Sequence, residues 1–304
     1  MTEQLFSQLE ERGYQGRIVP IQHLRDLQEE IEGRYRQGIF DKEFYQERLA
    51  WFDFRLPDSL PEARSLIVVA VPRPQSQIVL TWNGESRSLI IPPTYVAYEG
   101  TRKRVEDVLA GTLGAEGYHV ARTALPLKLL AVGSGLGWYG RNNICYVPGM
   151  GSFHQLVACY SDLPCQEDNW REAQMMESCQ NCHACLHHCP TGAITSDRFL
   201  LRAERCLVFH NERSGDIPFP AWMDPSWHNC PEGCLHCQRV CPQDRDFLQW
   251  IEGKEEFSQE ETALLLEGVP ADQLPAATVK KLERLDLIGD LDILPRNLSV
   301  FFKK

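Results

Sequence analysis

The sequence has no cysteine before Cys145 and none after Cys241, although its 304 residues include twelve cysteines. It also has no uninterrupted apolar run of the roughly 20 residues that a membrane-spanning helix needs. Its first residues are acidic and amphipathic, and they lack the basic start and apolar core of a signal peptide. These absences lead us to expect a cytoplasmic protein, in which clustered cysteines are metal ligands more often than disulfides.

A basic field is missing as well. The formal net charge is −11, which argues against a general nucleic-acid binder and disfavours tRNA as a partner. Hydrophobic residues make up 43% and charged residues 24% of the chain, as is ordinary for a globular protein.

The cysteines that are present follow a recognisable spacing. Cys179, Cys182, Cys185 and Cys189 form the pattern C-x2-C-x2-C-x3-C-P, which is the bacterial ferredoxin spacing for iron–sulfur clusters. A second run, C-x2-C-x3-C-P, begins at Cys234. In two-cluster ferredoxins the fourth cysteine of such a run binds the other cluster. We therefore predict two [4Fe-4S] clusters, one held by Cys179, Cys182, Cys185 and Cys241, and the other by Cys189, Cys206, Cys234 and Cys237.

Zinc is the alternative metal, because C-x2-C pairs also build zinc sites. The third cysteine at x2 spacing and the proline after each run favour clusters. Cys230 lies close enough in sequence to replace Cys234 as a ligand, and this alternative stays open.

Periodicity indicates mixed α and β structure. A strand is expected over 65–71, where an apolar, β-branched run is bounded by prolines, and Asn83-Gly84 predicts a hairpin turn. Ser258 and Glu261 form a capping-box pattern at the start of a helix. The remaining expectations are helices over 2–12, 21–36, 101–116 and 276–285, and strands over 118–123 and 155–160.

The segment over 126–152 is rich in glycine, which indicates backbone that turns sharply or approaches something large. The order of strand, Gly-x-Gly-x-x-Gly and helix is absent from it, so a Rossmann dinucleotide site is rejected.

The order of these motifs resembles the epoxyqueuosine reductase family, and more broadly the cobalamin-dependent reductases that include reductive dehalogenases. The resemblance is carried by residues 135–142 (Gly-Leu-Gly-Trp-Tyr-Gly-Arg-Asn), 151–153, 161–164, 179–194, 205–206, 233–242 and 296–297.

The resemblance implies an α/β (α+β) fold in three parts. A nitroreductase-like cobalamin-binding domain would cover 1–172, a ferredoxin-like double-cluster domain 173–250, and a helical C-terminal segment 251–304. Base-off cobalamin is the expected cofactor beside the clusters, with FMN as the alternative. The residues implied to bind it are Gly135, Gly137, Trp138, Gly140, Arg141, Asn142, Gly151, Ser152 and Phe153.

One position departs from the family pattern. Family members carry a general-acid Asp shortly before a proline upstream of the glycine-rich segment, and that position falls on Thr123 here. A threonine cannot protonate a substrate efficiently. Lys128, Tyr95 and Tyr98 are the substitute candidates, because a tyrosine with a nearby cation donates the proton in the dehalogenase branch.

Three functions follow from the resemblance. The first is a cobalamin-dependent iron–sulfur reductase of a small-molecule or modified-nucleoside substrate, supplied with electrons by a ferredoxin or flavodoxin. The second is reduction of epoxyqueuosine in tRNA itself. The third is an electron-transfer or corrinoid-handling protein without substrate chemistry.

Overall fold

A computed structural model describes residues 2–302. These residues form two compact units, each assembled from separate stretches of the chain. The first unit contains 2–72, 99–183 and 196–203, and the second contains 73–98, 184–195 and 204–302. The three-part division at residues 172 and 250 stays a prediction.

The first unit is built on an antiparallel sheet in the order β1-β2-β8-β5. The strands expected over 65–71, 155–160 and 118–123 are all confirmed, the last one shortened, whereas the edge strand β1 was not predicted. The bounds are β1 (Gln15–Pro20), β2 (Ser65–Pro72), β5 (Val120–Arg122) and β8 (His154–Ser161).

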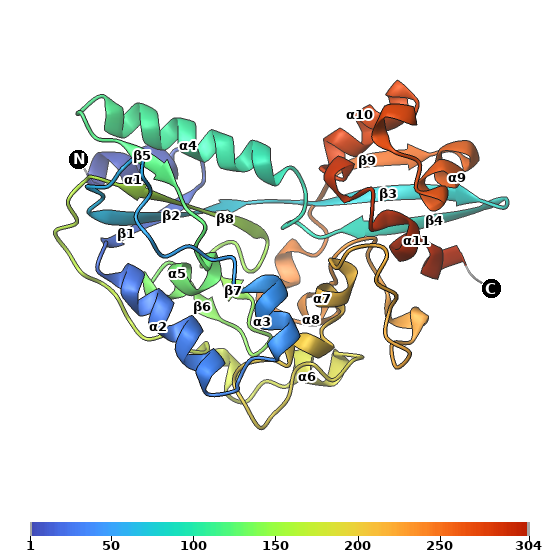
Figure 1. The fold of residues 1–304 in the computed structure, drawn as a ribbon, viewed down its shortest axis with the longest axis horizontal. Helices are drawn as coiled ribbons and strands as arrows, with labels where there is room; N and C mark the ends of the chain where they lie inside the picture. The colour runs from blue at the N-terminus through green and yellow to red at the C-terminus, as the bar shows by residue number, and fades with distance from the viewer. Residues whose placement is uncertain (1, 303–304) are drawn as a thin grey trace. The chain divides into compact units, whose positions relative to one another are not determined.

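Strand β2 is buried on both faces, which explains its unbroken apolar sequence. Because side chains alternate along a strand, Leu66 and Val68 join one core while Ile67 and Val69 join another. Figure 1 shows the helices that form the outer layers of these two cores. They are α2 (His23–Arg36) and α5 (Leu127–Gly133) on the first face, and α1 (Thr2–Glu10) and α4 (Tyr98–Gly114) on the second.

Helix α5 lies inside the glycine-rich segment and was not predicted. Its residues Leu129 and Leu130 are buried, and Gly133 ends it. The surrounding glycines concealed this short helix, because glycine is unfavourable in a helix interior. The other elements of the first unit are α3 (Lys42–Arg48), β6 (Trp138–Tyr139), β7 (Cys145–Tyr146) and the 3₁₀ helix η1 (Glu177–Cys179).

The second unit contains a sheet in the order β4-β3-β9. Strands β3 (Gln75–Trp82) and β4 (Glu85–Ile91) are joined by the predicted turn, in which Asn83 and Gly84 both have positive φ. Trp82 pairs directly with Glu85, so the loop has two residues, as a twisted hairpin favours. Strand β9 (Ile251–Phe257) was not predicted, because its charged sequence carries little β-propensity.

Helices pack on this sheet and close a third core, which includes Ile78, Leu80, Leu282 and Leu298. The capping box of Ser258 and Glu261 is confirmed at the start of α9. The helices are α9 (Gln259–Glu267), η5 (Ala271–Gln273), α10 (Ala276–Leu285), η6 (Ile288–Asp290) and α11 (Leu294–Phe302).

Between β4 and β9 the second unit has little regular structure. Short helices alternate with loops in this region, and they carry six of the eight predicted ligand cysteines. The helices are α6 (Ala184–His188), η2 (Ala203–Arg205), α7 (Leu207–Asn211), η3 (Pro225–Trp227), α8 (His236–Arg239) and η4 (Pro242–Phe247).

The mixed α and β structure confirms the predicted fold class. Among residues 2–302, no helix has both the length and the apolar character needed to cross a membrane.

Candidate functional site: the cysteine loops and their supports

Cys179 and Cys182 belong to the first unit, where one arginine organises the backbone around them. The Arg141 guanidinium donates to the carbonyls of Cys179 at 2.8 Å, Gln180 at 3.2 Å and Cys182 at 3.0 Å. Three carbonyls on one planar guanidinium fix the turn that presents both thiols. Arg141 was predicted to bind the cofactor, and the structure shows it binding the cysteine loop.

The second predicted ligand set lies wholly within the second unit. Cys206 precedes α7, and burial, the Cys189 thiol and the Glu212 carboxylate raise its pKa to about 11. Burial, together with Cys206, Cys230 and Cys189, also raises the pKa of Cys234. These mutual effects place Cys189, Cys206 and Cys234 in one neighbourhood, as ligands of one cluster require.

Backbone groups face the same thiols. The N–H groups of Val208 and Phe209 lower the pKa of Cys206 by hydrogen bonding, and that of His236 does the same for Cys234. Amide donors aimed at sulfur favour the thiolate, which is the form that binds a metal. Arg205 adds a tie between loops, since its Nε donates to the Thr191 carbonyl at 3.1 Å.

Cys230 is fully buried and lies beside Cys234. Burial raises its pKa to about 12, while Arg239 acts in the opposite direction. Because Cys230 lies near Cys234, it stays the alternative to Cys234 as a ligand of the second cluster. Among residues 2–302, no three His, Cys, Asp or Glu side chains, the predicted ligand cysteines included, are placed as ligands of a single metal ion.

The C-terminal helix α11 holds the loops of the second set. Asn297 Nδ2 donates to the carbonyls of Asn211 and Pro231, each at 2.9 Å. Asn211 in turn donates to the carbonyl of Gly233, next to Cys234, at 2.8 Å. Arg296 donates to the Asn211 carbonyl as well, and to three further carbonyls, those of His210, Ser214 and Ile217. The motif over 296–297 is thus a structural support for the cysteine loops.

Tyr95 lies in the same unit, close to these loops. Its hydroxyl donates to the Glu212 carboxylate, and its ring packs on Gly233, where an added Cβ would lie 2.4 Å from the ring. Burial raises the pKa of Tyr95 well above its usual value, with Glu212, Glu232 and Cys206 adding to the effect. Tyr98 starts α4, and its backbone N–H donates to Asp286.

In the first unit, the glycine-rich segment packs closely against its own chain. A Cβ at Gly137 would lie 2.6 Å from the Tyr146 carbonyl, and one at Gly140 would lie 2.5 Å from Asn142 Oδ1. Asn142 is buried and donates to the Tyr146 hydroxyl at 3.0 Å. Packing therefore explains both glycines and Asn142. Ser152 and Phe153 are also buried, whereas Gly135 has a positive φ of 78° with only Arg171 nearby.

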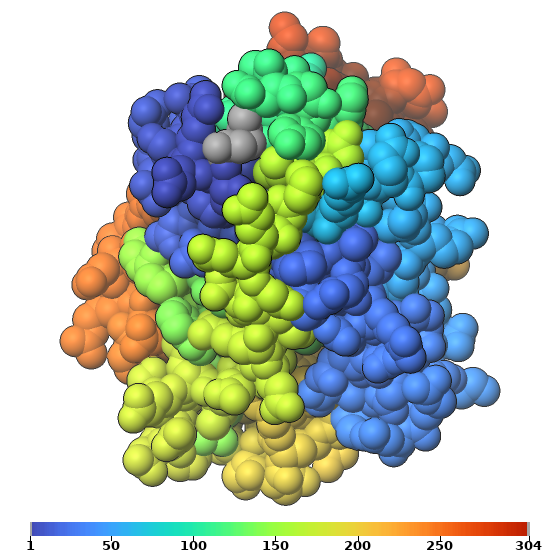
Figure 2. Space-filling model, turned by 90° about the vertical axis from the view of Figure 1, so that its left-hand side faces the viewer, coloured from blue at the N-terminus to red at the C-terminus, as the bar shows by residue number. Residues whose placement is uncertain are grey.

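The segment that follows β8 fastens this region from outside. The Trp170 ring fills the space over Gly133, and Arg171 donates to the carbonyls of Val132 at 3.2 Å and Gly137 at 2.6 Å. Arg171 also lies over the Trp138 ring at 4.7 Å. Figure 2 shows this yellow-green segment running across the surface beside the blue N-terminal part of the chain.

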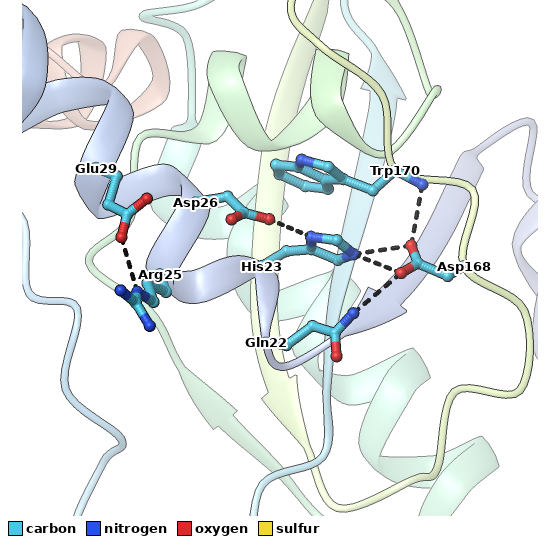
Figure 3. A network of polar contacts seen from close by, with 7 residues as sticks. All are labelled: Gln22, His23, Arg25, Asp26, Glu29, Asp168 and Trp170. Carbon is cyan, nitrogen blue, oxygen red and sulfur yellow. Dashed lines mark hydrogen bonds and ion pairs between the residues drawn. The ribbon is translucent and has the colours of Figure 1, made fainter.

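A buried histidine anchors the same segment (Figure 3). His23 lies between two carboxylates, with Nδ1 2.5 Å from Asp26 and Nε2 2.8 Å from Asp168. The Trp170 ring stacks on the imidazole at a centroid distance of 4.4 Å. Sequence patterns gave no sign of this contact, because His23 and Asp168 are 145 residues apart.

Two remaining positions of interest lie in the first unit. The Thr123 hydroxyl donates to the Ala158 carbonyl on β8 at 3.2 Å, so it serves the sheet. Lys128 is exposed on α5 and lies close enough to Cys145 to lower the pKa of that thiol against the larger effect of burial. Lys128 belongs to the first unit, whereas Tyr95 and Tyr98 belong to the second.

Comparison with known proteins agrees with the cysteine pattern. Residues 178–244 match the family described as the 4Fe-4S double cluster binding domain. The chain is 33% identical over 150 residues to the epoxyqueuosine reductase of Pseudomonas aeruginosa, covering 47% of this chain and 40% of that protein. It is 28% identical over 197 residues to the epoxyqueuosine reductase of Staphylococcus aureus, covering 62% and 50%.

Over part of its length the chain is similar to epoxyqueuosine reductases. These alignments span half or less of the length of the two curated relatives. The double-cluster match favours iron–sulfur clusters over the zinc alternative.

Solved epoxyqueuosine reductases share the fold. The structure from Streptococcus thermophilus has a TM-score of 0.66 at 18% identity, covering 99% of this chain and 80% of that one. An epoxyqueuosine reductase solved with an epoxyqueuosine-modified tRNA-Tyr stem loop has a TM-score of 0.64, also at 18% identity, with coverages of 98% and 80%.

Proposed function

We propose that this chain is an iron–sulfur reductase in which two [4Fe-4S] clusters pass electrons to a bound cobalamin. The observation that supports it best is the gathering of Cys189, Cys206 and Cys234 in one half-buried neighbourhood, inside the stretch that matches a double-cluster domain. A ferredoxin or flavodoxin would be the external electron donor.

The residues fit the clusters. Cys189, Cys206, Cys234 and Cys237 would hold the second cluster, with Cys230 as the alternative to Cys234. Cys179, Cys182, Cys185 and Cys241 would hold the first. When bound, the clusters supply one-electron transfer at low potential. The chain's contribution is to exclude water, to aim backbone N–H groups at the thiolates, and to fix the loops through Arg141 and Asn297.

The resemblance supports cobalamin, and FMN remains the alternative cofactor. Gly137 and Gly140 are filled by the chain's own atoms, so they offer no open surface to a corrin ring. Gly135, Trp138 and the backbone over 151–153 are the predicted positions left for such a contact.

The substrate is proposed to be a modified nucleoside or a related small molecule. Reduction of epoxyqueuosine in tRNA is the second candidate, favoured by the relatives' names and by the tRNA stem loop in one solved relative. The Thr123 hydroxyl is engaged with the sheet, so the proton must come from another group. Lys128 and Tyr98 stay proposals for that donor.

The test begins with anaerobically purified protein. Four irons for each of two clusters and a visible absorption that bleaches on reduction are expected, and a chain that binds only zinc would overturn the proposal. Cobalamin and FMN are then titrated separately. Turnover of epoxyqueuosine-containing tRNA by the loaded protein would establish the second candidate. Cobalamin reduction without turnover of any nucleoside substrate would leave electron transfer as the function.

A further inference from the structure

Tyr95 and Glu212 form a polar pair beside the second cysteine set. The two residues are 117 positions apart in sequence, and the tyrosine hydroxyl donates directly to the carboxylate. Both lie in the second unit, as do all four cysteines of that set. The contact therefore comes from the fold of that unit.

The position of the tyrosine is fixed by packing. Its ring occupies the space where a Cβ on Gly233 would lie, and Gly233 has a positive φ of 71° that suits glycine. The carbonyl of Gly233 is held by Asn211, and Asn211 is held by Asn297. Tyr95 is thus locked against the residue that directly precedes Cys234.

The position of the carboxylate is fixed by the hydroxyl. Glu212 follows α7, whose N-terminal cap is Cys206, and its negative charge acts on the Cys206 thiol. It also acts on Tyr95 together with Glu232, which is 6% exposed. Glu212 is half-buried, and a charge that is partly removed from water acts on its neighbours more strongly than a fully exposed one.

We propose that Tyr95 holds the Glu212 carboxylate beside Cys206, and that this fixed negative charge lowers the reduction potential of the cluster bound by Cys189, Cys206, Cys234 and Cys237. This rests on the proposed function, since it requires both clusters. Reduction adds one electron to the cluster, and a neighbouring carboxylate opposes that added charge. Net charge and the groups around the sulfurs are the levers by which proteins set cluster potentials.

Because Glu212 acts on Cys206, a ligand of the second set, we expect its effect on the cluster that this set binds. Tyr95 becomes a positioning residue of the second cluster, which differs from its predicted role as a proton donor to substrate. The lowered potential would make the second cluster a stronger reductant than it would be without the carboxylate.

The test is a redox titration of the full chain, with both clusters loaded, using dithionite and mediators under nitrogen and electron paramagnetic resonance as the readout. Glu212→Gln keeps the shape of the side chain and removes its charge. Glu267→Gln is the matched control, because Glu267 is exposed on α9 and the substitution changes the net charge equally. We expect one midpoint potential to become more positive in E212Q, with the other unchanged, and no shift in E267Q.

Iron content separates the two proposals. Wild-type protein without two clusters contradicts the proposed function, whereas loaded E212Q with both potentials unchanged contradicts the role of Glu212 alone. If E212Q does not load, Glu212→Asp and Tyr95→Phe carry the test. Wild-type potentials in E212D with a shifted one in Y95F would support the pair, and an unshifted Y95F would overturn it.

Discussion

The Arg141 guanidinium donates to the Cys182 carbonyl at 3.0 Å, and to those of Cys179 and Gln180 as well. We predict that Arg141→Lys weakens retention of the first cluster, because an ammonium group cannot bind three carbonyls in a planar fork. A loss of about 1.5 kcal/mol corresponds to roughly tenfold faster iron release. The measurement is iron transfer to a chelator over time.

Arg198→Lys is the control for this experiment, since Arg198 also donates to backbone carbonyls, those of Ile39 and Leu200. Equal acceleration in the two variants would show that Arg141 has no special connection to the cluster.

The second prediction concerns the packing of the Trp170 ring against Gly133. A Cβ at Gly133 would lie 2.5 Å from the Trp170 ring, so Gly133→Ala should lower the free energy of unfolding by about 1–3 kcal/mol through overpacking. Gly111→Ala is the opposite control. Gly111 lies in α4 with open space around it, and alanine there should stabilise by roughly 0.5–1 kcal/mol.

Urea unfolding of G133A, W170L and the double variant measures the coupling between the two positions. Additive effects would mean that the ring does not restrict position 133.

Thr123 is predicted to replace the acid of the family pattern, and its hydroxyl donates to the Ala158 carbonyl. We predict that Thr123→Val costs about 1 kcal/mol of unfolding free energy and leaves turnover per loaded enzyme unchanged. Thr123→Ser, which keeps the hydroxyl, should retain both properties. A loss of kcat in T123V that T123S restores would return Thr123 to the chemistry.

Local patterns were enough for part of this fold. Burial on both faces made β2 visible as an apolar run, the Asn83-Gly84 pair predicted a hairpin turn, and Ser258 with Glu261 predicted a helix start. The cysteine spacing indicated the double-cluster region for the same reason, since cluster ligation fixes residue type and interval.

Contacts distant in sequence were out of reach. The sequence around Arg141 does not predict its hydrogen bonds to carbonyls near residue 180. The sequence around Tyr95 likewise does not predict its hydrogen bond to Glu212. Strand β9 was missed because its pairing with β3 compensates for a charged sequence of low β-propensity. Glycines 137 and 140 suggested a ligand, whereas their neighbours turned out to be parts of the same chain.

The carboxylates around His23 differ in what they hold. Asp168 accepts from Gln22 and from the Trp170 backbone N–H and also contacts His23, whereas Asp26 contacts His23 (Figure 3). We predict that Asp168→Asn lowers the free energy of unfolding by about 1–2 kcal/mol more than Asp26→Asn does. The melting temperature of D168N should therefore be the lower of the two. Limited proteolysis should then cut D168N over residues 165–175 sooner than D26N. Equal cutting of the two variants would contradict this anchoring role.

The last prediction concerns Asp290 and the change of protein stability with pH. Burial raises its pKa to about 6, with Asp286, Asp292 and Glu212 contributing. The unfolded chain releases this proton near pH 4, so the native state binds more protons between about pH 4 and pH 6. Stability from this group therefore falls as the pH rises through that window.

Asp290→Asn removes the ionisation, and we expect it to stabilise the protein at pH 7 by on the order of 1 kcal/mol while leaving its stability at pH 4 unchanged. Asp272→Asn is the control, because Asp272 is exposed in η5 and the same charge is removed. Thermal unfolding at the two pH values makes the comparison. A gain of equal size at pH 4 and pH 7 would show that Asp290 is already ionised at the lower pH, and that burial does not hold its proton.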